Sequence, residues 1–110
     1  MTEAEIEIER SSGNVYSDLG FRDAAEMLVK AQLVAKIGEI LAARNWTQQQ
    51  ASKVLGIPQP KLSKMLRGQF RGISEAKMME CLTKLGRDIR IVIGSESVTA
   101  SIGRVEVISA

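Results

Sequence analysis

Between residues 23 and 44, apolar positions recur at three- and four-residue steps, which is the spacing of an amphipathic helix. Asp23 and Glu26, three residues apart, have the spacing of a capping box at its start. We therefore predict a long helix over 23–44. Its recurring apolar positions are Met27, Leu28, Ala31, Leu33, Val34, Ile37, Ile40 and Leu41.

Two shorter helices are predicted over 45–68, where helix caps and helix stops alternate. Thr47 and Gln50 have the spacing of a second capping box. Gly56 can adopt the left-handed conformation that ends a helix, and Gly68 repeats this signal at the end of the next one. The residues expected to face inward are Ala51, Val54, Leu55, Ile57, Leu62, Met65 and Leu66.

A fourth helix and a change to strand character complete the pattern. Ser74 is a suitable cap for a helix over 75–85, and Gly86 a suitable stop. The segments 87–93 and 102–108 are rich in β-branched residues, and we predict short strands there. The predicted fold class is therefore mainly α, a helix-turn-helix bundle of four main helices with short C-terminal β-strands.

The length of 110 residues fits one compact domain with tails. We divide it into an N-terminal arm (1–22), the helical domain (23–86) and a C-terminal β extension (87–110) that we expect to serve dimerisation. Acidic and apolar residues alternate in the arm, which fits either a short edge strand or a flexible acidic tail. The alternating residues are Glu3, Ala4, Glu5, Ile6, Glu7, Ile8 and Glu9.

No targeting or membrane signal is recognisable in the sequence. No apolar run approaches the roughly 20 residues that span a bilayer, and the first ten residues are acidic, unlike a signal peptide. The single cysteine, Cys81, cannot form an internal disulfide. We expect a cytoplasmic protein with no membrane contact.

Positive charge is concentrated in one window of the sequence. Between Ile40 and Ser74 there are six basic residues and no acid, whereas the rest of the chain holds nine bases and thirteen acids. A solvated helix face explains such a window as well as a binding surface does. On the two short helices, however, an unpaired basic face favours an anionic partner, and double-stranded DNA fits best.

The sequence gives little support for catalysis or metal binding. The chain contains no histidine, and Cys81 lies on an apolar helix face with no base to activate it. No glycine-rich phosphate loop follows a strand. We therefore expect a protein that is not an enzyme and that holds no metal or cofactor.

The segment from Asn45 to Gly68 resembles the helix-turn-helix of the Xre/Cro-like, phage-repressor class, with the cap, the Gly56 turn and the following Ile57 at the expected spacing. The resemblance covers about 23–86. It implies a lambda-repressor-like fold in which the first short helix braces the DNA backbone and the second enters the major groove.

Four further segments resemble HigA-type antitoxins and their small Xre-family relatives. They are 13–20, 57–63, 66–72 and 85–88. This resemblance implies autorepression of an operon that encodes a RelE-like, ribosome-dependent RNase toxin. Residues 94–110 extend beyond this pattern and receive no role from it.

The chemistry of single residues gives a set of predicted DNA contacts. Gln48 opens a helix whose N-terminus suits phosphate, although its amide can equally serve the cap. Gln59 and Lys61 lie in the first turn of the second short helix, where Gln can pair with adenine and Lys with guanine. Two interpretations of Arg71 stay open. It contacts a phosphate, or it pairs with a carboxylate and so closes a loop. The full predicted set is Thr47, Gln48, Gln59, Lys61, Ser63, Lys64, Arg67 and Arg71.

We expect a homodimer that binds a palindromic operator, with Ile89, Ile91 and Ile93 lining one face of the dimerising strand. The predicted function is sequence-specific repression as the antitoxin of a toxin-antitoxin operon. Two alternatives stay open. One is a solitary Xre-family regulator without a toxin, and the other is a toxin-inhibiting protein without a DNA role.

Overall fold

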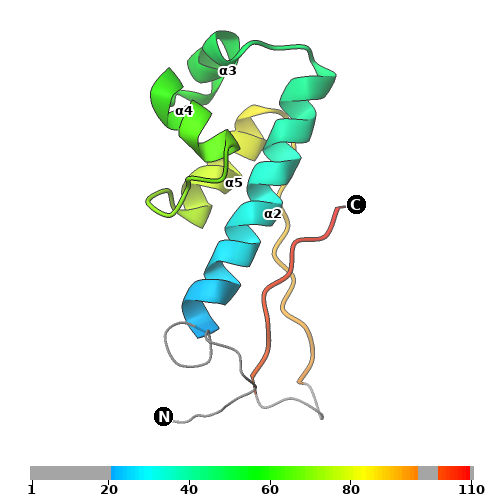
Figure 1. Cartoon of the computed structure of the whole chain (residues 1–110). Coiled ribbons are helices and arrows are strands. Elements are labelled where there is room, and N and C mark those ends of the chain that lie inside the picture. The colour runs from blue at the N-terminus through cyan, green and yellow to red at the C-terminus, as the bar shows by residue number, and fades with distance from the viewer. Residues whose placement is uncertain (1–20, 97–101, 110) are drawn as a thin grey trace.

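The computed structural model describes residues 21–96 and 102–109, and within them the chain forms four helices. They are α2 (Phe21–Ala43), α3 (Gln48–Leu55), α4 (Gln59–Leu66) and α5 (Glu75–Lys84). Figure 1 shows α2 as one long rod, with the three short helices gathered along its C-terminal half. The predicted helical bundle is confirmed. The expected strand in the N-terminal arm lies outside the described residues.

The long helix contributes one side of the core. Its buried residues are Val29, Leu33, Val34, Ile37, Ile40 and Leu41. Two apolar positions of the predicted repeat, Leu28 and Ala31, are exposed. The capping box at Asp23 is also wrong, because α2 begins at Phe21 and Asp23 lies inside its first turn. The carboxylates of Asp23 and Glu26 pair with basic side chains, those of Arg71 and Lys30, instead of with helix backbone.

The predicted capping box of α3 is confirmed. Thr47 Oγ1 accepts a hydrogen bond from the Gln50 N–H at 3.1 Å, and Gln50 Oε1 accepts one from the Thr47 N–H at 2.9 Å. Gly56 ends the helix with φ +69°, in the left-handed region that favours glycine. Ile57 then enters the core with 2% of its surface exposed. The start and end of α3 are therefore set by its own sequence.

One inward assignment on α3 is wrong. Val54 is 43% exposed, whereas Ala51 and Leu55 are fully buried. Ala51 and Leu55 are four residues apart and share one face of the helix. Because α3 has only eight residues and packs on α4 and α5, one buried face is enough to hold it in place, and Val54 lies beside that face.

The helix α4 is held mainly by Leu62 and Met65, which are fully buried. Gly38 of α2 faces Leu66, since a Cβ added there would lie 4.0 Å from the Leu66 side chain. A side chain at this position would make an ordinary van der Waals contact, so the packing of α2 on α4 does not require glycine here. The helix α5 begins at its predicted cap, where Ser74 accepts a hydrogen bond from the Lys77 N–H.

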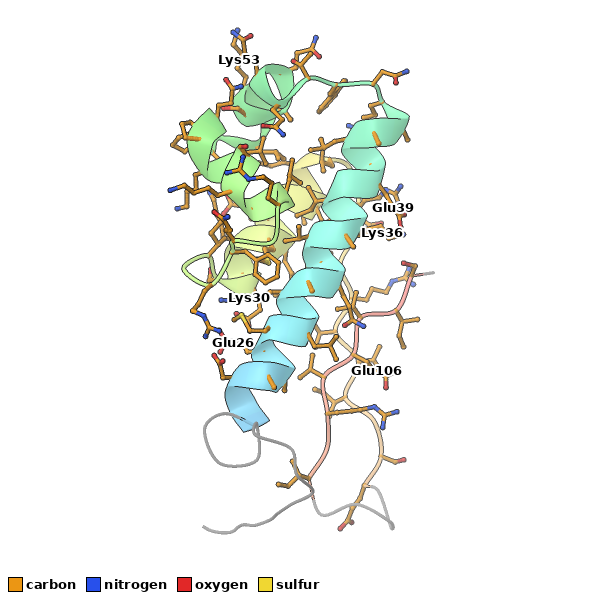
Figure 2. The ribbon with its side chains drawn as sticks, viewed as in Figure 1. Glu26, Lys30, Lys36, Glu39, Lys53 and Glu106 are labelled. Carbon is orange, nitrogen blue, oxygen red and sulfur yellow. The ribbon has the colours of Figure 1, made fainter. Side chains whose placement is uncertain are left out.

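A buried lysine joins α2 to the loop after α4. Lys30 is only 2% exposed. Its Nζ pairs with the Glu26 carboxylate at 3.1 Å and donates to the backbone carbonyl of Arg71 at 3.0 Å. Figure 2 shows Lys30 and Glu26 on the side of α2 that faces this loop. The sequence pattern did not predict this contact.

The expected C-terminal strands are absent from the described parts of the chain, 87–96 and 102–109, where no residue belongs to a strand. Side chains on both faces of the first segment are exposed, including Ile91 (77%), Val92 (84%) and Ile93 (88%). A strand requires a partner to satisfy its backbone, and these segments form no ladder with the rest of the described chain. No helix in the described ranges is long and apolar enough to cross a membrane.

Candidate nucleic-acid interface

The exposed side of α4 brings several predicted contact residues together. Gln59, Lys61 and Lys64 are exposed, and Ser63 is half-buried. Gln59, Ser63 and Arg67 follow one another at four-residue steps, so they form one row along the helix surface. Lys61 and Lys64, three residues apart, form a second exposed row. The helix thus presents an amide, a hydroxyl and cationic groups on one surface.

This surface holds no acidic partner within the described residues. Neither Lys61 nor Lys64 makes an ion pair there, and Arg67 donates from Nη1 to the Ser63 hydroxyl at 3.0 Å. The Ser63 contact holds the guanidinium along the helix without neutralising it. A surface of this kind can bind an anion without first breaking an ion pair.

The helix α3 packs against α4, and its N-terminus is the end that follows the loop from α2. Thr47 and Gln48 are both exposed at this terminus. The capping box uses the Thr47 hydroxyl and the Gln50 amide, so the Gln48 amide is not needed for the cap. The partial positive charge at a helix N-terminus favours an anion here.

Lys53 is a further cation on this part of the molecule that was not among the predicted contacts. It is exposed on α3, and Figure 2 shows its side chain pointing away from the bundle. The only sequence signal for it was its place in the acid-free window.

Arg44 and Arg71, two cations of that window, serve contacts with distant parts of the chain. Arg44 donates from Nη2 to the Leu85 carbonyl at 2.6 Å, at the C-terminus of α5, and its guanidinium lies 4.9 Å from the centre of the Trp46 ring. Arg71 pairs with Asp23 at 2.6 Å, which is the second of its two predicted interpretations. Phe70 and Trp46 pack partly buried against the core.

Lys84 of α5 fixes the turn between α3 and α4. Its Nζ donates to the Leu55 carbonyl at 3.1 Å and pairs with Glu80 at 3.0 Å. The hydrogen bond from Lys84, together with the charge of Lys77, lowers the pKa of Glu80 below its ordinary value. Glu80 therefore stays ionised at neutral pH and keeps the Lys84 ammonium beside the last turn of α3.

Cys81 is fully buried on α5. Burial raises the pKa of its thiol, which keeps the less nucleophilic protonated form at neutral pH. Its position is that of a core residue.

The predicted dimerisation residues follow α5 in the sequence and do not belong to α4. Ile89 is 36% exposed, and Ile91 and Ile93 are much more so. In the second C-terminal segment, Val107 packs partly buried against the core. Three more large apolar residues of that segment are exposed, Ile102, Val105 and Ile108.

Comparisons with known proteins agree with this geometry. A family model described as a helix-turn-helix domain matches residues 15–94. A solved structure described as a candidate XRE-family transcriptional regulator is similar to the chain, with a TM-score of 0.74 and 30% sequence identity over 80% of this chain and 99% of the other. None of the curated proteins matches the chain.

Proposed function

Because the chain belongs to the family of helix-turn-helix regulators of the XRE type, we propose that α4 is its DNA-recognition helix and that it represses transcription from a palindromic operator. The observation that carries this proposal is the exposed face of α4, on which Gln59, Lys61 and Lys64 have no acidic partner in the described residues. We also propose that this regulator works in the cytoplasm, as expected from its sequence.

Within this proposal, Gln59 and Lys61 read base edges, because the first turn of a recognition helix lies deepest in the major groove. Thr47 and Gln48 meet phosphate at the N-terminus of α3. Ser63, Lys64 and Arg67 lie farther along α4. The phosphate contacts supply most of the affinity, and the base contacts supply the discrimination.

We expect two substitutions on α4 to have different effects. Lys64→Ala should weaken binding to all duplexes and reduce the slope of log K against log salt by about 0.9, the value for one lost phosphate contact. Gln59→Ala should instead reduce discrimination at one base pair by about 1–3 kcal/mol.

Sites selected from a random duplex pool and then titrated at several salt concentrations provide the measurement. Gln49→Ala, an exposed Gln on α3 outside the predicted contacts, is the matched control. Equal losses on selected and random DNA for Gln59→Ala would refute base reading by this residue. Selection of no site at all would refute the proposed function.

We further propose that this regulator is the antitoxin of an operon that it represses and that it neutralises a RelE-like RNase toxin. The segments that resemble HigA-type antitoxins support this role. An RNase must present a basic surface to RNA, and the acidic arm of this chain has the complementary charge. Residues 1–20 of the arm lie outside the described residues, so this argument rests on the sequence of the arm.

Deleting residues 1–12 should therefore weaken neutralisation of the toxin encoded beside this gene and leave operator binding intact or slightly stronger. The check is growth rescue of cells that express the toxin, combined with operator titration of the same truncated protein. Undiminished rescue would exclude the arm as the inhibitory element. If no toxin is encoded nearby, the chain acts as a solitary regulator.

The proposed repressor is a homodimer. The exposed apolar residues of the two C-terminal segments support a second copy as the partner, because a large exposed apolar surface favours association. Two copies would also supply the two-fold symmetry that a palindromic operator needs.

A further inference from the structure

Among the cations between Ile40 and Ser74, Arg71 is the one with an acidic partner in the described residues. Its Nη1 lies 2.6 Å from Oδ1 of Asp23, which belongs to the first turn of α2. The window from Ile40 to Ser74 contains no acid, so this carboxylate is brought in from a distant part of the sequence. We propose that Asp23 lowers the DNA affinity of this protein by holding the Arg71 guanidinium, and that DNA binding exchanges the carboxylate for a backbone phosphate.

The pair is open to exchange because it is exposed. The Arg71 side chain is 71% exposed and the Asp23 side chain 47%. Both residues line a groove between α2 and the loop after α4, together with Phe70. Exposed ion pairs are weak and are screened by salt, so a phosphate can displace the carboxylate.

The backbone at Arg71 is held independently of its side chain. The buried Lys30 donates to the Arg71 carbonyl at 3.0 Å, and the Ile73 N–H donates to the Phe70 carbonyl at 2.9 Å. Ile73 itself is buried. The guanidinium can therefore leave Asp23 while the loop keeps its position, so the side chain alone moves between the two partners.

The location of the loop makes phosphate a suitable second partner. Figure 1 shows the loop between α4 and α5 directly after the C-terminal end of α4, on the side of α2 where α3 and α4 lie. Arg67, the C-cap of α4, is a predicted contact without an acidic partner in the described chain. Arg71 would add a further positive charge beyond this end of the helix once Asp23 releases it.

The test is a double-mutant cycle on operator DNA, and it rests on the proposed function. Asp23→Asn should lower the Kd about two- to five-fold, which corresponds to removing one competing exposed ion pair. Arg71→Gln should raise the Kd and reduce the salt slope by about 0.9. In the double variant the gain from Asp23→Asn should vanish, because the guanidinium that it releases is missing.

Glu39→Gln is the matched control. Glu39 is an exposed acid of the same helix that pairs with Lys36, so the control changes the net charge equally without touching Arg71. Its Kd should stay near that of the unaltered protein. Thermal melting of every variant checks that the fold is retained, and Arg71→Lys provides a charge-retaining second variant.

The outcomes separate this inference from the proposed function. An unchanged or raised Kd for Asp23→Asn overturns the inference, and so does a gain that persists in the double variant or matches that of Glu39→Gln. If one of these results overturns the inference while Lys64→Ala still weakens binding in the same assay, the DNA role stands without the inference. If the unaltered protein binds no duplex, the proposed function itself fails.

Discussion

Leu62→Ala should lower the free energy of unfolding by about 2–5 kcal/mol, because it opens a cavity under the recognition helix. Leu62 and Met65 are fully buried and hold α4 against the core. With eight residues, α4 is shorter than the roughly 12–15 residues that an isolated helix needs. Its order therefore depends on this packing, and operator affinity should fall together with stability. Urea denaturation followed by circular dichroism measures the loss.

Val54→Ala is the control for this prediction. It also shortens an aliphatic side chain on a helix of the helix-turn-helix, but Val54 is 43% exposed. Its effect should stay below about 1 kcal/mol, since exposed substitutions leave no cavity. If the two variants lost equal stability, the burial pattern of α3 and α4 would be wrong, and the inward position expected for Val54 from sequence would be restored.

The features that sequence predicted well depend on neighbouring residues. Thr47 and Gln50 close their capping box within one turn, and Gly56 ends α3 by its own conformational freedom. Ser74 caps α5 in the same local way. The position of the turn and of the exposed row on α4 follows from these signals. Much of the candidate site is therefore predictable from the amino-acid sequence alone.

The features that sequence missed depend on distant partners. Arg44 contacts a carbonyl 41 residues away. For Arg71 the sequence allowed a carboxylate as one of two partners but did not identify Asp23, which lies 48 residues away. Neither contact leaves a pattern in the neighbouring sequence. Lys30 is buried for the same reason, since its acceptors include the Arg71 carbonyl. The count of charges between Ile40 and Ser74 could not show that Arg44 and Arg71 already make contacts within the chain.

The C-terminal segments show a different limit. Alternation of β-branched residues indicates what a segment can form, but a strand also needs a partner. Ile91, Val92 and Ile93 are exposed in succession, so both faces of the segment lack cover in the single chain. The sequence signal for strands can thus be satisfied by a second copy, which supplies both the missing backbone partners and the apolar cover.

Ile91→Asp should shift the protein from dimer to monomer and weaken operator binding by about 100-fold or more. The charge would have to be buried without a partner at the proposed interface, which opposes association. A monomer engages one half-site, so it loses the gain of binding two sites together, which is commonly about 100-fold or larger. Sedimentation equilibrium gives the mass, and titration of full and half operators gives the affinity.

Ala35→Asp is the matched control, because it introduces the same charge at another exposed apolar residue, on α2. It should remain dimeric and should bind the full operator as the unaltered protein does. Binding of a single half-site should be similar for both variants, since neither residue lies on α3 or α4. A dimer that persisted in Ile91→Asp would move the interface away from the C-terminal segment, with α5 as the next surface to test. A monomer produced by Ala35→Asp alone would instead place the interface on α2.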